Sequence, residues 1–191
     1  MKPIIFSIIL FTSVSSFAQN FEMDGTEIGF DLAFNASTNG GNAGVGLKYG
    51  INFGESLILG PSARYERTWI KNTFTEAKGG YNVYGGGVFG HYRFQNVLFL
   101  GVEFEMLKSP YTKIGQLTSL PSWAPTLFLG GGFSREFNES FRINAGIMYD
   151  VINAENSPFK RSYNFTVKNE QGQVVKILPI IFRLAFFIPL S

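Results

Sequence analysis

The sequence predicts an all-β fold, an eight-stranded antiparallel up-and-down transmembrane β-barrel, and three observations predict it. After residue 18, apolar side chains alternate with small or polar ones along most of the chain. The charged residues within these stretches, away from the strand ends, share one face of each strand, with a single exception. The connections between the stretches alternate between long and short. Together these patterns predict a barrel with an apolar outer face and a polar lumen.

The first eighteen residues have the features of a cleavable signal peptide. Lys2 precedes an apolar run from Pro3 to Phe11, and Ser16-Phe17-Ala18 fits the small-x-small pattern of a signal-peptidase site. The alternative is a membrane-anchoring helix, but the run is shorter than the roughly 20 apolar residues that a helical span needs. The sequence therefore divides into a signal peptide, residues 1–18, and one barrel domain, residues 19–191.

Composition narrows the classes of function. The chain has no cysteine, which excludes a disulfide framework and a thiolate metal site. A net charge of +2 provides no basic footprint for nucleic acid, so we expect no nucleic-acid partner. The 22 glycines and the 16% of aromatic residues suit strands with large outward rings and small inward residues.

Eight stretches qualify as strands, and residues 43–52 are the clearest. One face carries Ala43, Val45, Leu47, Tyr49 and Ile51, and the other carries Gly44, Gly46, Lys48, Gly50 and Asn52. Most stretches have the roughly 9–11 residues that a tilted membrane-crossing strand needs. The predicted strands are residues 25–35, 43–52, 57–69, 80–93, 97–108, 122–134, 140–151 and 176–189.

Loop length predicts the orientation. Outer-membrane barrels have short periplasmic turns and longer outer loops. The short connections here are residues 53–56, 94–96 and 135–139, and the longest is 152–175. We therefore expect both termini in the periplasm.

The placement of charge favours a membrane barrel over a soluble one, which would turn its apolar face inward. Among the charges away from the strand ends, only Arg67 lies on the apolar face, near the outer end of its strand, where it can reach lipid headgroups. Arginine suits buried ion pairs because its planar guanidinium donates several hydrogen bonds at once. The predicted lumen charge network is Glu27, Asp31, Lys48, Arg64, Glu66, Arg93, Glu103, Glu105, Arg142, Asp150 and Arg183.

The apolar face carries aromatic residues near the strand ends, as expected where rings meet the two membrane interfaces. The alternative is the ordinary enrichment of aromatics in strands. The outer group is Trp69, Tyr84, Trp123 and Tyr149, and the periplasmic group is Tyr49, Tyr92, Phe94, Phe133 and Phe141.

With this signal peptide, these loop lengths and alternating strands such as Ala43–Asn52 and Phe141–Tyr149, the chain resembles the small eight-stranded outer-membrane proteins of Gram-negative bacteria. These are the OmpX type and the membrane half of the OmpA type. The resemblance implies an integral outer-membrane barrel that contacts outer-membrane lipids. Members serve as anchors, adhesion or defence factors, narrow pores and, occasionally, lipid-modifying enzymes. Barrels of this type often end in an aromatic residue, whereas this chain ends Ile188-Pro189-Leu190-Ser191.

Few residues are candidates for chemistry, and we predict no catalytic, cofactor-binding or metal site. His91 is the only histidine, and the histidine–serine pair of lipid-deacylating barrels is absent because Arg93 stands at the second position. We interpret His91 as part of a polar lumen network. Glu103 and Glu105 share a face and could serve acid–base chemistry, but inward arginines favour structural ion pairs.

Two further expectations concern the lumen and the last loop. Closure of the barrel should bring Asp31 and Arg183 within ion-pair reach, and an eight-stranded lumen filled by side chains should be sealed. Residues 163–177 predict a hairpin that continues the last two strands, and the loop Asn153–Lys176 is the candidate site for a protein partner. We therefore expect a structural or interaction role through the outer loops. A narrow channel for small solutes and a lipid-modifying enzyme are the alternatives.

Overall fold

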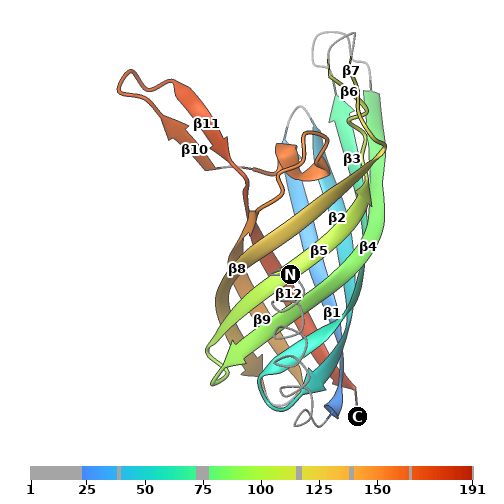
Figure 1. Ribbon diagram of the computed structural model, residues 1–191, viewed down its shortest axis with the longest axis vertical. Coiled ribbons are helices and arrows are strands. Elements are labelled where there is room, and N and C mark those ends of the chain that lie inside the picture. The colour runs from blue at the N-terminus through green and yellow to red at the C-terminus, as the bar shows by residue number, and fades with distance from the viewer. Residues whose placement is uncertain are drawn as a thin grey trace, which may run out of the picture.

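The computed structural model describes residues 23–37, 40–71, 78–114, 118–137, 140–163 and 165–190, so the predicted signal peptide, residues 1–18, lies outside the described residues. Eight antiparallel strands form one closed barrel (Figure 1), which confirms the predicted fold class. Each strand pairs with its neighbours in sequence, and the first and last strands close the ring. The barrel strands are β1 (Met23–Ser37), β2 (Gly40–Phe53), β3 (Leu57–Lys71), β4 (Lys78–Phe94), β5 (Leu98–Lys108), β8 (Trp123–Phe137), β9 (Phe141–Asp150) and β12 (Ile180–Leu190).

Two small hairpins stand apart from the barrel sheet. Strand β6 (Lys113–Ile114) pairs with β7 (Thr118–Ser119), and β10 (Phe165–Lys168) pairs with β11 (Val174–Leu178). Both belong to long loops at the same end of the barrel, which we call the long-loop end (Figure 1). The opposite end carries the short turns, and we call it the turn end.

Each predicted strand overlaps one barrel strand, but the last begins later than predicted. The prediction was residues 176–189, whereas β12 begins at Ile180. Pro179 has no N–H to donate to a strand neighbour, and it lies at the point where the chain leaves the sheet. Residues 174–178 pair with β10 instead. The predicted hairpin therefore exists, but it forms a separate two-stranded sheet that projects away from the barrel and does not continue its last two strands (Figure 1).

The short turn between β4 and β5 explains how two strands reverse within a few residues. The N–H of Val97 donates to the carbonyl of Phe94 at 2.9 Å. The central residues, Gln95 and Asn96, have φ angles of 48° and 57°. A two-residue turn with positive φ at both central positions has a backbone twist that matches the right-handed twist of the flanking strands. This turn fixes the register that sends alternate side chains of β4 and β5 to the lumen.

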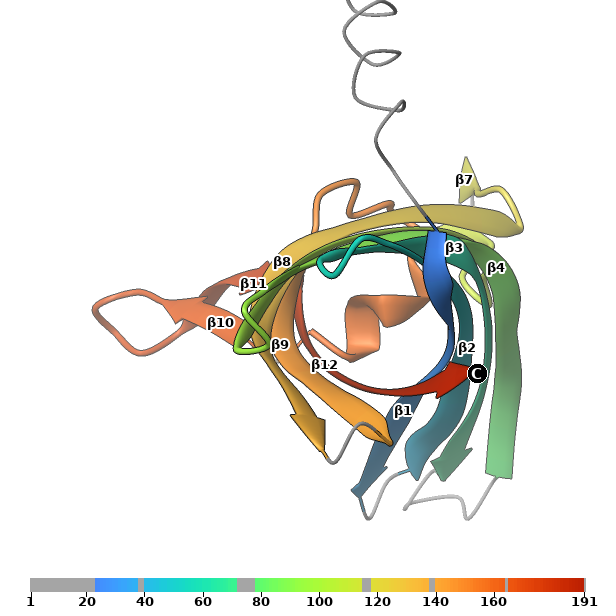
Figure 2. The same cartoon turned by 90° about the horizontal axis from the view of Figure 1, so that it is seen from below.

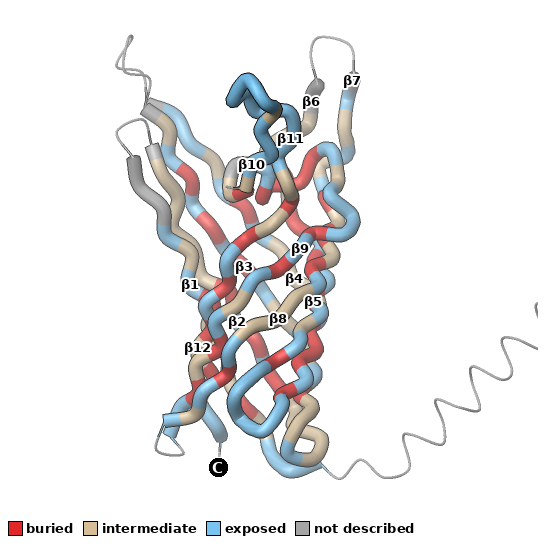
Figure 3. The backbone as a smooth tube through the Cα atoms, turned by 90° about the vertical axis from the view of Figure 1, so that its left-hand side faces the viewer, coloured by how far each residue is buried: buried red, intermediate tan, exposed pale blue. Residues whose placement is uncertain are grey.

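The barrel is inverted relative to a soluble protein, with polar groups inside and apolar groups outside. On β5, Glu103 and Glu105 are each 1% exposed. Phe104, which lies between them, is 38% exposed, and Leu100, earlier on the same outward face, is 57% exposed. Figure 3 shows this alternation of buried and exposed residues along the strands. All the aromatic residues predicted for the two ends of the apolar face are exposed, from Trp69 at 37% to Phe133 at 71%. Arg67 is exposed on the same face and donates to Asn82 at 2.8 Å.

Candidate functional site

The centre of the lumen holds a network of six buried charges, which we call the central cluster. Three acids face three bases, so the cluster is neutral overall. Its members come from β1, β2, β3, β5 and β12, and their side chains are 1–7% exposed. Such burial requires pairing, because an unpaired charge in a dry interior is costly. The central cluster consists of Asp31, Glu103, Glu105, Lys48, Arg64 and Arg183.

Asp31 and Glu103 hold the central cluster together because each contacts more than one base. Asp31 pairs with Lys48, with Arg64 at 3.2 Å and with Arg183 at 3.6 Å. Glu103 lies 3.0 Å from the Lys48 ammonium and 3.1 Å from Arg183. The predicted approach of Asp31 and Arg183 across the closing pair of strands is therefore confirmed.

Arg64 extends the central cluster toward the long-loop end. Its Nε and Nη2 donate to the carboxylate of Glu105 at 2.9 Å and 3.0 Å. Glycine makes this arrangement possible, since a Cβ added at Gly46 would lie 3.1 Å from the Asp31 carboxylate and 3.3 Å from Arg64. A side chain at Gly46 would occupy the space that these ion pairs use.

A second polar layer lies nearer the turn end. Arg93 donates to both carboxylate oxygens of Glu27 at 2.7 Å, the bidentate geometry that only a guanidinium provides. Arg142 pairs with Glu136, a residue that the sequence analysis did not place in the lumen. Strand β8 runs to Phe137, beyond the predicted end at residue 134, and this extension carries Glu136 inward.

His91 takes part in the polar network, as the sequence analysis interpreted it. Its Nε2 lies 3.1 Å from Glu103, and its Nδ1 lies 3.5 Å from the Asn144 amide. Aromatic rings surround it, with Phe89 and Phe99 each at 5.2 Å between centroids and Phe187 at 5.7 Å. These contacts hold the imidazole within a packed layer. Among the described residues, no group of three or more His, Cys, Asp or Glu could hold a metal ion.

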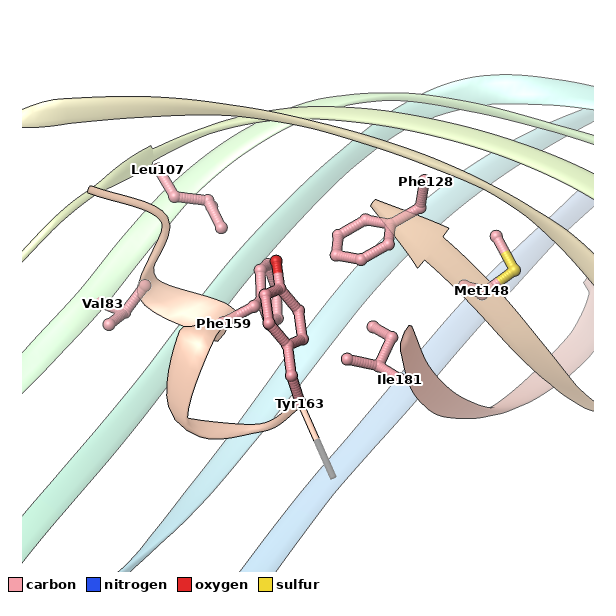
Figure 4. Packing of buried hydrophobic residues seen from close by; sticks show 7 residues of the cluster. All are labelled: Val83, Leu107, Phe128, Met148, Phe159, Tyr163 and Ile181. Carbon is pink, nitrogen blue, oxygen red and sulfur yellow. The ribbon is translucent and has the colours of Figure 1, made fainter. Parts of the chain in front are cut away.

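The loop after β9 folds back into the long-loop end of the barrel and forms a plug, which the sequence analysis did not predict. A single-turn 3-10 helix, η1 (Pro158–Arg161), lies within the ring of strands (Figure 2). Phe159 and Tyr163 are 6% and 8% exposed. Their rings join an apolar cluster inside the barrel (Figure 4), together with Val83, Leu107, Phe128, Met148 and Ile181.

Asp150, at the end of β9, anchors this plug. It was predicted as part of the charge network, but the partners that the structure shows for it are hydrogen-bond donors. Its Oδ1 accepts from the backbone N–H of Leu127 at 3.3 Å and of Asn153 at 3.1 Å. Its Oδ2 accepts from the Tyr163 hydroxyl at 2.8 Å. Burial raises the pKa of Tyr163, which keeps this hydroxyl protonated as a donor.

The plug also contacts the charges beneath it. The Phe159 ring packs edge-on against Phe128 at 5.0 Å between centroids. The guanidinium of Arg64 lies 5.5 Å from the centroid of Phe159, and that of Arg183 lies 5.3 Å from the centroid of Phe128. Cations over aromatic faces are attracted by the ring quadrupole. The apolar plug and the central cluster therefore form one continuous filling.

Two cavities adjoin this filling, one at the turn end and one at the side of the barrel between β1 and β12. One, of about 370 Å³, lies at the turn end beside Arg93, Gln95 and Arg142. The other, of about 410 Å³, lies beside the plug and includes Arg183 and Phe159 in its lining. The central cluster and the rings around His91 separate them.

All eleven residues of the predicted charge network are buried. Nine of them take part in ion pairs, including the Glu27–Arg93 and Glu136–Arg142 pairs near the turn end. Glu66 is buried as well, but the partner that the structure shows for it is neutral: it accepts a hydrogen bond from the Asn42 side-chain amide at 2.8 Å. The residues that the sequence analysis missed are Glu136, Asn144, Phe159, Tyr163 and Phe187. Glu136, Asn144 and Phe187 carry a usable signal, because each shares the parity of the inward residues of its strand, whereas Phe159 and Tyr163 lie in a loop and carry none.

The fold and the site define a class of protein, a small eight-stranded β-barrel with an apolar exterior and a filled, ion-paired lumen. No helix among the described residues is long and apolar enough to cross a membrane. No family model matches the chain, and no curated protein matches it.

Among solved structures, the chain is similar to the outer membrane protein Ail of Yersinia pestis, determined as a backbone structure in a phospholipid bilayer nanodisc. The two are 14% identical, and the match covers 87% of this chain and 100% of that chain with a TM-score of 0.45. This likeness is too distant to carry a function across.

Proposed function

We propose that this chain is an integral outer-membrane β-barrel protein with a structural or interaction role, meeting protein partners through its extracellular loops. The observation that supports this most is the inversion of the barrel. Leucine, valine and phenylalanine face outward along every strand, while the described charged side chains of the barrel's middle are buried. In water, so large an apolar surface would cause aggregation, whereas in a bilayer it is the surface that lipid solvates.

The filled lumen favours this role over transport. An eight-stranded barrel is only wide enough for side chains to fill it. Here the central cluster blocks the middle and the plug blocks the long-loop end. Function is then left to the surfaces at the ends of the barrel.

The β10–β11 hairpin is the surface best suited to a partner. Four β-branched apolar residues on it are 42–60% exposed, namely Val167, Val174, Val175 and Ile177. Because the hairpin forms a two-stranded sheet of its own, its outer edges have no strand neighbours among the described residues. An exposed edge of this kind pairs with an extended segment of another protein. The hairpin is attached to the barrel by the Phe165 ring, which lies 5.3 Å from that of Phe182.

Cell fractionation tests the location. The protein should be recovered with outer membranes and should migrate differently on a gel before and after heating, because a closed barrel resists unfolding in detergent. Recovery in the soluble periplasmic fraction would contradict the proposal.

The hairpin role is tested with a photo-crosslinking amino acid at Val175 on intact cells. We expect a covalent adduct with a second protein, and we expect it to disappear when Val174→Pro removes an N–H from the same edge. The same label at Leu100, on the lipid-facing side of β5, is the matched control. Equal adducts at Leu100, or adducts that survive Val174→Pro, would contradict partner binding through the strand edge.

A further inference from the structure

The strands that close the barrel are paired along only part of their length. Among the described pairs, β1 and β12 run together from Thr26 and Leu190 to Asp31 and Ala185. Beyond that point β1 continues to Ser37 beside β2 alone, and residues 180–184 of β12 pair with β9 alone. Figure 3 shows the two strands together near the turn end and apart above it. We call this unpaired upper half the open seam.

The cavity of about 410 Å³ lies at the open seam, between residues 31–34 of β1 and 181–184 of β12. Its lining combines residues from both faces of the barrel. Leu32, Phe34, Phe182 and Leu184 are lipid-facing residues of the two edges, 42–78% exposed. Asp31, Arg64 and Arg183 line it from the lumen, and Phe159 of the plug also belongs to its lining. The cavity therefore has an apolar mouth and a polar inner end.

Three buried polar atoms on two of the cavity's lining side chains have no hydrogen-bond partner among the described residues. They are Oδ1 of Asp31 and the Nε and Nη2 of Arg183, on side chains that are 2% and 7% exposed. Of these, Nη2 lies 3.1 Å from the Glu103 carboxylate as an ion pair, so Oδ1 and Nε are the acceptor and the donor left free. Buried polar groups are nearly always hydrogen-bonded, so an acceptor and a donor left free at one cavity require an explanation. A ligand whose polar group reaches this depth would satisfy both.

The register sets the depth of the open seam. Ile180, at its upper end, pairs with Tyr149, which belongs to the aromatic group at the long-loop end. Phe182 and Leu184 follow below it on the outward face of β12. If aromatic rings mark the interface, the mouth opens just beneath it, where acyl chains surround the protein.

We infer that the open seam binds a single-chain lipid amphiphile, whose hydrocarbon chain occupies the apolar mouth and whose hydrogen-bonding head group reaches Asp31 and Arg183. This inference rests on the proposed function, because it requires the barrel to lie in a bilayer. A volume of about 410 Å³ lies within the roughly 300–1,000 Å³ of small-ligand pockets, which suits one chain better than a lipid with several.

A partner strand fits the open seam less well than an amphiphile. A strand would satisfy the backbone groups of the edges, but the free atoms at the inner end belong to side chains inside the barrel. Unpaired backbone groups facing hydrocarbon are costly. A polar head group, and water that accompanies it from the loop side, would lower that cost at the same place.

The test uses the full chain in phosphatidylcholine vesicles with a monopalmitoylglycerol probe that carries a diazirine on its chain and whose hydroxyls both donate and accept hydrogen bonds. Illumination should label the four mouth residues more strongly than equally exposed residues such as Leu100 on β5. Unlabelled monopalmitoylglycerol should compete for the mouth, and hexadecane should compete much less because it has no head group. Ala33→Trp, which fills the cavity, should reduce labelling of the mouth several-fold, whereas Ala63→Trp on the outer face of β3 should not.

The outcomes separate this inference from the proposed function. Labelling in proportion to exposure around the whole barrel, or no effect of Ala33→Trp, would overturn the seam site while leaving the membrane barrel intact. Absence of labelling at every outward residue would instead contradict the membrane barrel. Continuing the register by one step would oppose Leu32 to Leu184. Rapid disulfide formation in a Leu32→Cys/Leu184→Cys variant in vesicles would show that the seam closes in the bilayer, which would also overturn the site.

Discussion

The neutrality of the central cluster predicts a specific pattern of stability changes. Arg183→Met keeps most of the side-chain volume but leaves three buried acids facing two bases. Removing one partner of a buried ion pair costs about 3–5 kcal/mol. We expect the lower part of this range, about 3 kcal/mol, because Asp31 retains Lys48 and Arg64. Glu103→Gln should cost a similar amount, since it leaves Lys48 and Arg183 with Asp31 alone.

The double variant, Arg183→Met with Glu103→Gln, restores neutrality. Independent effects would sum to about 6 kcal/mol, but residues in contact couple by up to about 3 kcal/mol. The double variant should therefore be no less stable than either single one. Urea unfolding of the chain in vesicles, followed by the fluorescence of Trp69 and Trp123, measures these free energies. Arg67→Met, at an exposed arginine of the outer face, is the matched control and should change stability by less than about 0.5 kcal/mol.

Strictly additive losses would refute the reasoning, because they would show that the two charges do not compensate each other in the lumen. An Arg183→Met variant as stable as the wild type would show that water reaches the cluster and screens it.

Three further predictions concern the plug, the orientation and the lumen. Phe159→Ala should release the plug, seen as faster cleavage of residues 151–163 by added protease, whereas Lys160→Ala, at an exposed neighbour, should not. An epitope tag near Gln171 should be detected on intact cells and one at Gly54-Glu55 only after permeabilisation; the reverse result would overturn the orientation. In planar bilayers the wild type should show no steady conductance, because the central cluster fills the lumen, and a large stable conductance would favour the channel alternative.

The barrel could be predicted from the sequence because its signal is local. Alternation of side chains in β2 or β5 is visible over ten residues, and the parity of Lys48 or Glu103 follows directly from it. The approach of Asp31 to Arg183 followed from one global fact, the closure of an even number of antiparallel strands.

The plug could not be predicted in the same way. Its single turn of helix has no periodicity to recognise, and Phe159 and Tyr163 look like ordinary loop residues. Their burial depends on the space above Phe128, which exists only after the barrel has closed. The open seam is equally invisible in the sequence, because Leu32 and Leu184 alternate like their paired neighbours. Only Pro179 marks the place where β12 begins late.

The connectivity of Asp31 constrains how the barrel can be assembled. Its three bases lie on β2, β3 and β12, and Lys48 is only 17 residues away in sequence, whereas Arg64 is 33 residues away. Arg183 arrives with the final strand, after all the others have been made. A sheet that entered the bilayer strand by strand would carry incompletely neutralised charge at membrane depth until that strand joined, at a cost of several kcal/mol. If the chain lies in a bilayer as proposed, we therefore expect its insertion to be concerted, with the polar face kept away from lipid by curling of the sheet before its edges meet.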